Sequence, residues 1–397
     1  MHDGRRICLL VLGMHRSGTS AIARVTSLLG ADLPKVVMGP NRGNERGHWE
    51  PERLVACHDR LLEKLGSRWN DWQSLDKVDL PADELTDFKR ELSDLIDADF
   101  PESSFFVLKE PRLCRLVPFY AELLREKGIE PRYLLAIRNP LAVIHSLSDR
   151  DGILPGRVAL LWLRHALDAE HATRTVSRAV VSYEQVLLDW RPAMQRAGAR
   201  LSLRWPRLLD DAAAEITAFL TSEMQHFAPS RRELAARDDV SAWVRQAYRA
   251  LLDLEINPDD DAAIATLDRI RGAFDAASPM FADALQREID TRRGELAAVR
   301  ADAVAKAARI KQQDADLAGL RAELVKRDAS IGVLKGEIAA RETQLAVGEG
   351  TIKGLTAQVE AQREEISRFT AALAEVSEAG RAPETPHAFR AAMEGTG

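Results

Sequence analysis

The stretch that decides the fold is Ile7–Gly30, ICLLVLGMHRSGTSAIARVTSLLG. Ile7–Leu12 is a short run rich in Ile, Val and Leu, which predicts a strand buried on both faces. Gly13–Thr19 is a polar turn with two glycines, and Ser20–Leu29 has apolar residues at helical spacing before a glycine C-cap. A strand, a glycine-bounded loop and a helix in this order direct backbone N–H groups toward an anion at the helix N-terminus.

The loop differs from the nucleotide-triphosphate P-loop in the place of its cation. Gly13 and Gly18 have the spacing of G-x-x-x-x-G-K-[ST], but Thr19 stands where that motif has lysine. The positive charge lies inside the loop instead, at Arg16. A kinase without this lysine lacks the group that reaches the β- and γ-phosphates. We therefore expect the loop to hold a phosphate that does not belong to ATP with magnesium. The alternative is a glycine turn that only connects strand to helix.

Bulk composition excludes several classes of protein. The chain has 397 residues, a formal net charge of −6 and three widely spaced cysteines, Cys8, Cys57 and Cys114. This predicts two or three structural units, no non-specific binding to nucleic acid and a reducing compartment without disulfides. The apolar run after Arg5 and Arg6 is too short for a signal peptide. Since no stretch approaches the ~18 apolar residues of a membrane span, we expect a cytoplasmic protein.

Further apolar runs predict three more strands, at Ser104–Leu108, Arg132–Ile137 and Ala179–Tyr183. Helical patterns lie between them, among them Phe119–Lys127 and Leu160–Val176. Strands that alternate with helices predict a P-loop-like parallel α/β sheet flanked by helices, which we assign to residues 1–225. The predicted remainder is a helical extension at 226–285, a long coiled coil at 286–378 and a disordered tail at 379–397.

The coiled-coil prediction depends on a repeat of seven residues. One heptad position is apolar throughout, at Leu296, Ala303, Ile310, Leu317, Leu324, Ile331, Ile338, Leu345, Ile352, Val359, Ile366 and Leu373. The position three residues later is mixed: apolar at Val299, Leu320, Leu334, Leu355, Phe369 and Val376, but polar at Lys306, Gln313, Arg327, Arg341 and Gln362. Such a repeat predicts a coil that associates with itself or with a partner. The alternative is an amphipathic helix that folds back on the globular part.

A second basic segment follows the third predicted strand. That strand ends in Arg138, Asn139 suits an N-cap, Pro140 suits the first helical position, and Ser146 lies further along the helix. Open α/β sheets bind ligands at the carboxyl ends of their strands. The sequence thus predicts two anion sites on one edge, which suits a nucleotide with phosphates at both ends. Taken singly, Arg138 also fits a structural salt bridge and Ser146 a surface hydroxyl.

These segments resemble those of sulfotransferases. Gly13–Ser20 is similar to their 5′-phosphosulfate loop, P-[KR]-[SA]-G-T-[ST], and Arg138–Ser146 to their 3′-phosphate segment, R-[ND]-P followed by a serine. Lys109–Arg112 resembles the K-[DE]-P-R of bacterial members, and Val181–Glu184 their Y-E strand. The resemblance covers residues 5–225 and not the coil. The loop departs from the family at His15, where proline is usual, and in having arginine rather than the commoner lysine.

The resemblance implies that the chain moves a sulfuryl group from 3′-phosphoadenylyl sulfate to an acceptor hydroxyl or amine, with a carbohydrate or glycolipid as the expected acceptor. Catalysis of such a transfer depends on in-line positioning of the reactants and on stabilisation of the charge on the leaving phosphate. No metal is expected. Arg16 is the expected catalytic cation. The residues that the resemblance assigns to the donor are Arg16, Ser17, Gly18, Thr19, Ser20, Arg138 and Ser146.

The acceptor has to lose a proton, so a general base is expected. The segment Asn44–Glu50, NERGHWE, is similar to a stretch in bacterial relatives and offers Glu50, then His48, then Glu45. The alternative is that Glu50 only caps the next helix. Glu110 is a further candidate for the base. Two other functions stay open: a P-loop-like nucleotide or small-molecule kinase, and a non-catalytic scaffold that keeps the fold.

Overall fold

The computed structural model describes residues 5–39, 47–75, 80–221 and 227–380. The chain divides into two compact units, residues 1–289 and residues 290–397. The predicted tail lies outside the described residues from position 381 onward. Among the described residues, no helix is long and apolar enough to cross a membrane.

The first unit is built on four parallel strands in the order β2-β1-β3-β4. The strands are β1 (Arg6–Leu12), β2 (Phe105–Lys109), β3 (Ile129–Ile137) and β4 (Arg178–Ser182). All four predicted strands are therefore confirmed, and so is the predicted parallel α/β class. The largest difference between a predicted and an observed strand boundary is at β3, which begins three residues before its predicted start. Its first residues pair with β1, Pro131 lying opposite Cys8, although Glu130 and Pro131 interrupt the apolar pattern there.

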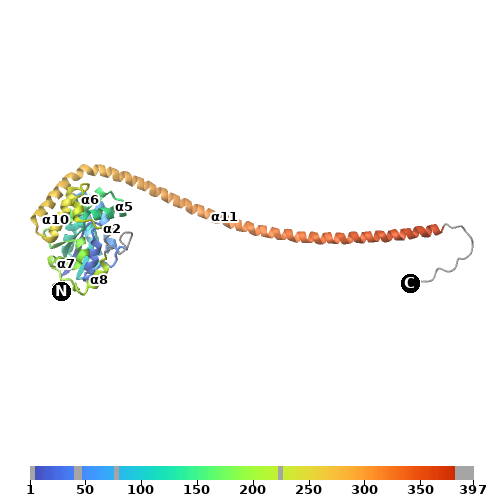
Figure 1. The fold of residues 1–397 in the computed structure, drawn as a ribbon, viewed down its shortest axis with the longest axis horizontal. Helices are drawn as coiled ribbons and strands as arrows, with labels where there is room; N and C mark the ends of the chain where they lie inside the picture. Colours follow the sequence, from blue (N-terminus) through green and yellow to red (C-terminus); the bar gives the residue numbers. More distant parts are fainter. Residues whose placement is uncertain (1–4, 40–46, 76–79, 222–226, 381–397) are drawn as a thin grey trace, which may run out of the picture. The chain divides into compact units, whose positions relative to one another are not determined.

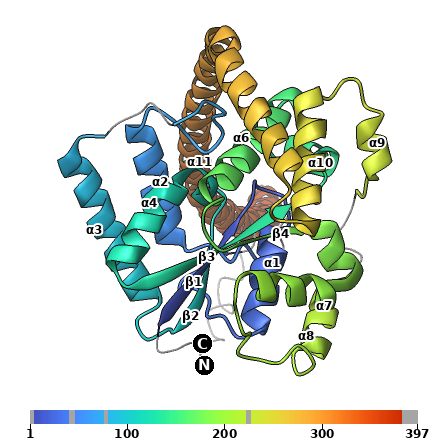
Figure 2. The same cartoon turned by 90° about the vertical axis from the view of Figure 1, so that its left-hand side faces the viewer.

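Helices cover both faces of this sheet (Figure 2). On one face, α1 (Thr19–Leu28), α7 (Tyr183–Arg200) and α8 (Ala213–Phe219) enclose a smaller core. The other face holds the larger core. Its helices are α2 (Glu52–Lys64), α3 (Ala82–Asp99), α4 (Leu113–Glu126), α5 (Pro140–Asp151), α6 (Pro155–Ala172), α9 (Arg231–Ala235) and α10 (Ala242–Ile256). Alternate side chains of β1 enter the two cores, which explains why its sequence is apolar without interruption.

Two helices begin earlier than their sequence patterns predict. Helix α4 begins at Leu113 rather than Phe119 and continues through Pro118, and α6 begins at Pro155 rather than Leu160. Proline disfavours the interior of a helix, but Leu113 and its neighbours on α4 are buried in the larger core. Tertiary packing therefore outweighs the local preference.

Helix α11 (Asp261–Ala379) is one continuous helix of 119 residues, drawn from yellow to red in Figure 1. Its first turns belong to the first unit, where Leu267, Ile270 and Phe274 are fully buried in the larger core together with side chains of α9 and α10. From residue 294 to residue 378 every side chain of α11 is exposed.

Candidate functional site

The Gly13–Gly18 loop connects β1 to α1 and turns through two residues of left-handed conformation. Arg16 has φ 68°, and Gly18, the N-cap of α1, has φ 82°. A side chain as large as arginine in this region costs about 1–3 kcal/mol, and such strain gathers at functional sites. Left-handed residues within a right-handed turn direct successive N–H groups into a concave anion site, and the first turn of α1 adds N–H groups that have no acceptor within the helix.

Both glycines of the loop are required by close packing. A Cβ added at Gly13 would lie 2.6 Å from the carbonyl oxygen of Ala136 in β3. One added at Gly18 would lie 2.2 Å from Cδ2 of Tyr183, the first residue of α7. The loop is thus held against the ends of β3 and β4.

The structure joins the two predicted anion-binding segments directly. Arg16 Nε donates a hydrogen bond of 2.7 Å to Ser146 Oγ, 130 positions away. Arg138 Nη1 donates one of 2.8 Å to the carbonyl oxygen of Arg16. The predicted N-cap of α5 is confirmed, since Asn139 Oδ1 accepts from Leu141 N at 3.0 Å. The ends of β1 and β3 therefore form one site.

Positive charge is concentrated around this junction. Arg138 is 7% exposed and lies 5.0 Å from the ring centre of Tyr183. Burial lowers the pKa of Arg138, and burial followed by the charges of Arg150 and Arg138 lowers the pKa of Arg16. A site that lowers the pKa of its cations favours a bound anion. Sequence reasoning missed Arg150, although it follows Ser146 by four residues on α5, a spacing that places both on one helix face.

Lys109, at the end of β2, ties the segment around Glu50 to α1. Its Nζ donates to Ser20 Oγ at 2.9 Å, to the His48 carbonyl oxygen at 3.1 Å and to Glu50 Oε1 at 2.5 Å. These bonds use all three of its N–H groups. Ser20 Oγ in turn donates to the His48 carbonyl oxygen at 3.3 Å, so this hydroxyl is engaged with the 48–50 segment.

Two of the three candidate bases lie beside the loop, and Glu45 lies outside the described residues. Glu50 is 4% exposed, and burial raises its pKa although the charge of Lys109 opposes the rise. His48 Nε2 is buried without a hydrogen-bond partner among the described residues. Burial, then the charge of Lys109, lowers the pKa of His48 to about 4, so its imidazole is neutral at pH 7. The N-cap residue of α2 is Pro51 rather than Glu50, and the Glu50 carboxylate accepts from Lys109 instead.

Glu110 belongs to a buried structural network. It is 1% exposed, its Oε2 lies 2.7 Å from His58 Nδ1, and its Oε1 accepts from Arg112 Nη1 at 2.5 Å. The other nitrogen of His58 lies 2.6 Å from the Tyr120 hydroxyl. Burial alone would raise the pKa of Glu110, but the hydrogen bonds from His58 and Arg112 outweigh it and lower the pKa to about 2. A carboxylate with so low a pKa is a poor base.

The low pKa of Glu110 predicts how acid affects stability. Folding lowers this pKa from 4.5 to about 2, so the ionised carboxylate stabilises the fold above pH 4.5, and that contribution disappears as the pH falls toward 2. Glu110→Gln should lower the free energy of unfolding at pH 7 by about 3 kcal/mol. In urea titrations the difference from wild type should stay constant above pH 5 and shrink below it. The control is Glu52→Gln, an exposed position; a difference that does not change with pH would contradict the assignment.

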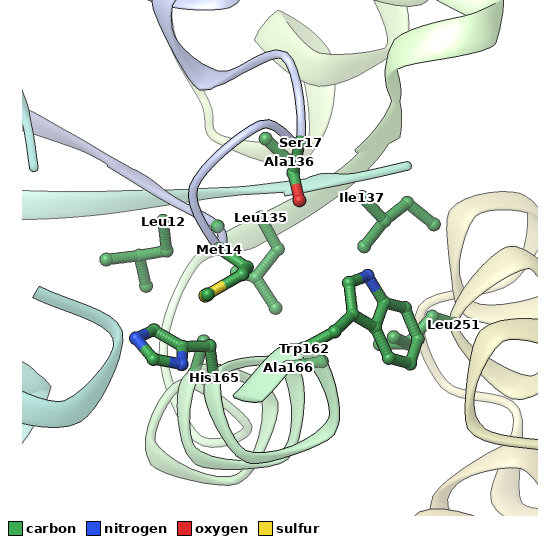
Figure 3. A pocket seen from close by; sticks show the side chains of 12 residues that line it. Leu12, Met14, Ser17, Leu135, Ala136, Ile137, Trp162, His165, Ala166 and Leu251 are labelled. Carbon is green, nitrogen blue, oxygen red and sulfur yellow. The ribbon is translucent and has the colours of Figure 1, made fainter. Parts of the chain in front are cut away.

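A small cavity of about 20 Å³ lies beneath the loop (Figure 3). Ser17 and His165 both line it, and Ser17 Oγ and His165 Nε2 are buried without a hydrogen-bond partner among the described residues. The volume matches a single water molecule. His165 Nδ1 lies 2.8 Å from the carbonyl oxygen of Leu161, and burial lowers the pKa of His165 to about 3. His165 is thus a buried neutral histidine that packs under the loop.

No family model and no curated protein sequence matches this chain. Among solved structures it is similar to the sulfotransferase domain of the Synechococcus PCC 7002 olefin synthase, with 16% identity and a TM-score of 0.33 over 68% of this chain and 96% of that one. It is similar to sulfotransferase STF9 from Mycobacterium avium, with 15% identity and a TM-score of 0.35 over 64% and 77%. It is also similar to mouse sulfotransferase SULT7A1 complexed with PAP, with 15% identity and a TM-score of 0.31 over 67% and 90%.

Proposed function

We propose that the chain is a sulfotransferase that moves a sulfuryl group from 3′-phosphoadenylyl sulfate to an acceptor hydroxyl or amine. The observation that carries this proposal is the junction at Arg16, whose side chain bonds Ser146 and whose carbonyl accepts from Arg138. Two basic segments that meet at the carboxyl ends of β1 and β3 match a nucleotide with phosphates on both its 5′ and 3′ sides. The lysine that a triphosphate loop needs is replaced by Thr19.

In this reaction the Gly13–Gly18 loop has to stabilise the leaving phosphate. The acceptor oxygen forms a bond to sulfur while the bond between sulfur and the 5′-phosphate oxygen breaks, and negative charge grows on that oxygen. Arg16 offers a planar fork of N–H donors for this charge. Backbone N–H groups of Gly18 and Thr19, at the positive end of α1, add to it, whereas the Ser17 N–H donates to the Met14 carbonyl oxygen at 3.0 Å. The products are the sulfated acceptor and 3′,5′-adenosine bisphosphate.

The acceptor proton is assigned to Glu50. Burial raises its pKa, which makes it a stronger base than a carboxylate in water, whereas His48 with a pKa of about 4 is a weak base. Lys109 orients the carboxylate through its bond to Oε1. His48 would then contact the acceptor through its ring nitrogen Nε2, which has no partner among the described residues.

Glu50→Gln tests this assignment. We expect turnover to fall by roughly 10²–10⁴-fold, the usual contribution of a general base. The wild-type rate should also decline as the pH drops through the raised pKa of Glu50, because protonation removes the base, and the variant should lack this acidic limb. Glu52→Gln, two residues away and exposed, is the matched control. A variant rate within tenfold of wild type would move the assignment to His48.

Binding of 3′,5′-adenosine bisphosphate is the direct test of the proposed donor site. Calorimetry in the presence of EDTA should show binding of the bisphosphate that is clearly tighter than binding of 5′-AMP. Ser146→Ala should weaken binding of the bisphosphate by roughly 10–150-fold and leave binding of 5′-AMP less affected, since one good hydrogen bond to a charged group contributes about 1.5–3 kcal/mol. Absence of bisphosphate binding would overturn the proposal. Binding of ATP only with magnesium would favour the kinase alternative.

The acceptor class is proposed from the resemblance alone. Carbohydrates and glycolipids offer hydroxyls of the required kind, and a screen of such acceptors with labelled donor is the measurement that identifies it. If the bisphosphate binds and no acceptor is sulfated, the scaffold alternative gains support. The cytoplasmic location stays a prediction.

A further inference from the structure

The second unit exposes a largely apolar stripe on α11, interrupted by polar residues at five d positions, which we call the seam. It consists of the a positions of the heptad, which begin at Leu296, and the d positions, which begin at Val299. The large apolar side chains of the seam are between 48% exposed, at Ile331, and 70% exposed, at Val376. An apolar surface of this length is normally covered by another protein surface, and a seam with a period of seven is the surface that a second helix covers.

We propose that the seam is covered by the same seam of a second copy of this chain, in a parallel, two-stranded coiled coil whose helices are in register. The choice of two strands follows from the side chains. β-Branched residues at a with leucine at d favour dimers. Six of the twelve a positions are β-branched, the other six being five leucines and Ala303, and leucine is the commonest apolar residue at d. The β-branched a residues are Ile310, Ile331, Ile338, Ile352, Val359 and Ile366, and the d leucines are Leu320, Leu334 and Leu355.

Charges beside the seam favour the parallel orientation. The g positions, one residue before each a, have one basic residue, Arg309, and six acidic ones: Glu295, Asp302, Asp316, Glu323, Glu337 and Glu365. In an antiparallel pair the g positions of the two helices face each other, so like charges would meet. In a parallel pair each g faces an e position five residues further along the second helix. The e positions have both signs: Arg300, Asp314, Arg321, Asp328, Lys335, Glu342, Glu349 and Arg363.

The charged residues beside the seam also favour the in-register alignment. In register, three g–e pairs join opposite charges: Glu295 with Arg300, Arg309 with Asp314, and Asp316 with Arg321 of the second copy. Such pairs are the usual means by which a coiled coil selects partner and orientation.

Two in-register pairs join like charges, and an arginine stands beside each. Asp328 would face Glu323, next to Arg327 at d, and Glu342 would face Glu337, next to Arg341 at d. Within the single helix, Arg327 Nη2 already lies 3.0 Å from Glu323 Oε1. Each arginine thus offsets the repulsion between the two carboxylates beside it. A shift of the register would separate the arginines from these carboxylate pairs. Polar residues in a seam lower stability but select one register.

Sedimentation equilibrium of the full chain tests the assembly. The subunit mass is 44.0 kDa, and we expect twice that value. Ile331→Lys with Ile338→Lys, both at a, should give monomers. The matched control is Ala322→Lys with Ala329→Lys at f positions on the opposite side of the helix, which should remain dimeric. A monomeric wild type, as expected if the helix folds back on its own chain, or a higher oligomer would overturn the proposal.

Single cysteines test orientation and register. The three native cysteines are buried, so wild type should remain unlinked under mild oxidation. Ala303→Cys and Leu373→Cys, at a positions near the two ends of the seam, should each form a disulfide-linked dimer alone. Ala301→Cys, at f, should not. In an antiparallel pair each a position faces a d position near the other end of the second helix, so neither single variant would cross-link, and that result would overturn the parallel arrangement. The melting temperature of the first unit, measured on the full chain, should be the same in wild type and in all of these variants.

Discussion

Replacing Arg16 by alanine is expected to lower the turnover of sulfuryl transfer by roughly 10²–10³-fold. Removal of one donor aimed at charge that develops in the transition state typically has this effect. In this site the loss should be at the upper end, because Arg16 is partly buried and its side chain also bonds Ser146. Arg16→Lys keeps the charge but not the planar fork, and its rate should lie between those of wild type and the alanine variant.

Stability should respond differently from turnover at this position. Alanine has the same difficulty as arginine with φ 68°, so Arg16→Ala should change the melting temperature little. Arg16→Gly relieves the strain and should raise the free energy of unfolding by about 1 kcal/mol while it abolishes turnover. Initial rates with labelled donor and melting curves measure the two effects separately.

The control for Arg16 is Arg24→Ala on α1. Arg24 lies 5.1 Å from the ring centre of Trp49, outside the Gly13–Gly18 loop, and its loss should have a much smaller effect on the rate. A rate for Arg16→Ala within tenfold of wild type, ~1.4 kcal/mol of barrier, would mean that the leaving group is stabilised by another residue.

Gly18→Ala is expected to combine a large loss of stability with a loss of donor binding. The added methyl group would lie 2.2 Å from Cδ2 of Tyr183, whose side chain is 3% exposed and has little room to move. Overpacking of this kind costs about 1–3 kcal/mol, and a left-handed φ of 82° adds roughly 1–2 kcal/mol. Since the loop must shift to relieve the contact, its N–H groups lose their alignment. Bisphosphate affinity should fall by more than about 100-fold, equivalent to ~2.7 kcal/mol.

Gly128→Ala separates the two causes. Gly128 has φ 67°, and an added Cβ there meets no atom within 4 Å, so this variant should lose only the conformational part, with full donor binding. Urea titrations give the free energies of unfolding, and calorimetry gives the affinities. Equal destabilisation of the Gly18 and Gly128 variants would show that contact with Tyr183 is unimportant. Normal bisphosphate binding by Gly18→Ala would remove the loop from the donor site.

The fold class and the local geometry of the Gly13–Gly18 loop and of the start of α5 were predictable because their signals are local. The run Ile7–Leu12 is apolar since both faces of β1 are covered, and Gly13 and Gly18 are spaced as an anion loop requires. Asn139 caps α5 as its position before Pro140 indicates. These features depend on residues within a few positions of one another, which is the range over which strand and helix periodicity operates.

The contacts that assign roles within the site depend on tertiary structure. Lys109 bonds Ser20 and Glu50, which are 89 and 59 positions away, because β2 lies next to β1 in the sheet. Alternation of strands and helices predicts a parallel sheet but not the order β2-β1-β3-β4. Glu110 resembles a candidate base in the sequence and becomes a structural anion only through His58 on α2.

The sequence by itself identified the candidate residues for the chemistry, namely a displaced cation at Arg16 and a second basic segment from Arg138 to Ser146. It also determined the heptad seam of α11, because a period of seven is visible along a single helix. Only the tertiary structure decided that Arg16 and Ser146 bond each other and that Glu50, not Glu110, is the buried carboxylate with a raised pKa. The physical reason is that a pKa and a hydrogen bond are set by burial and by neighbours distant in sequence.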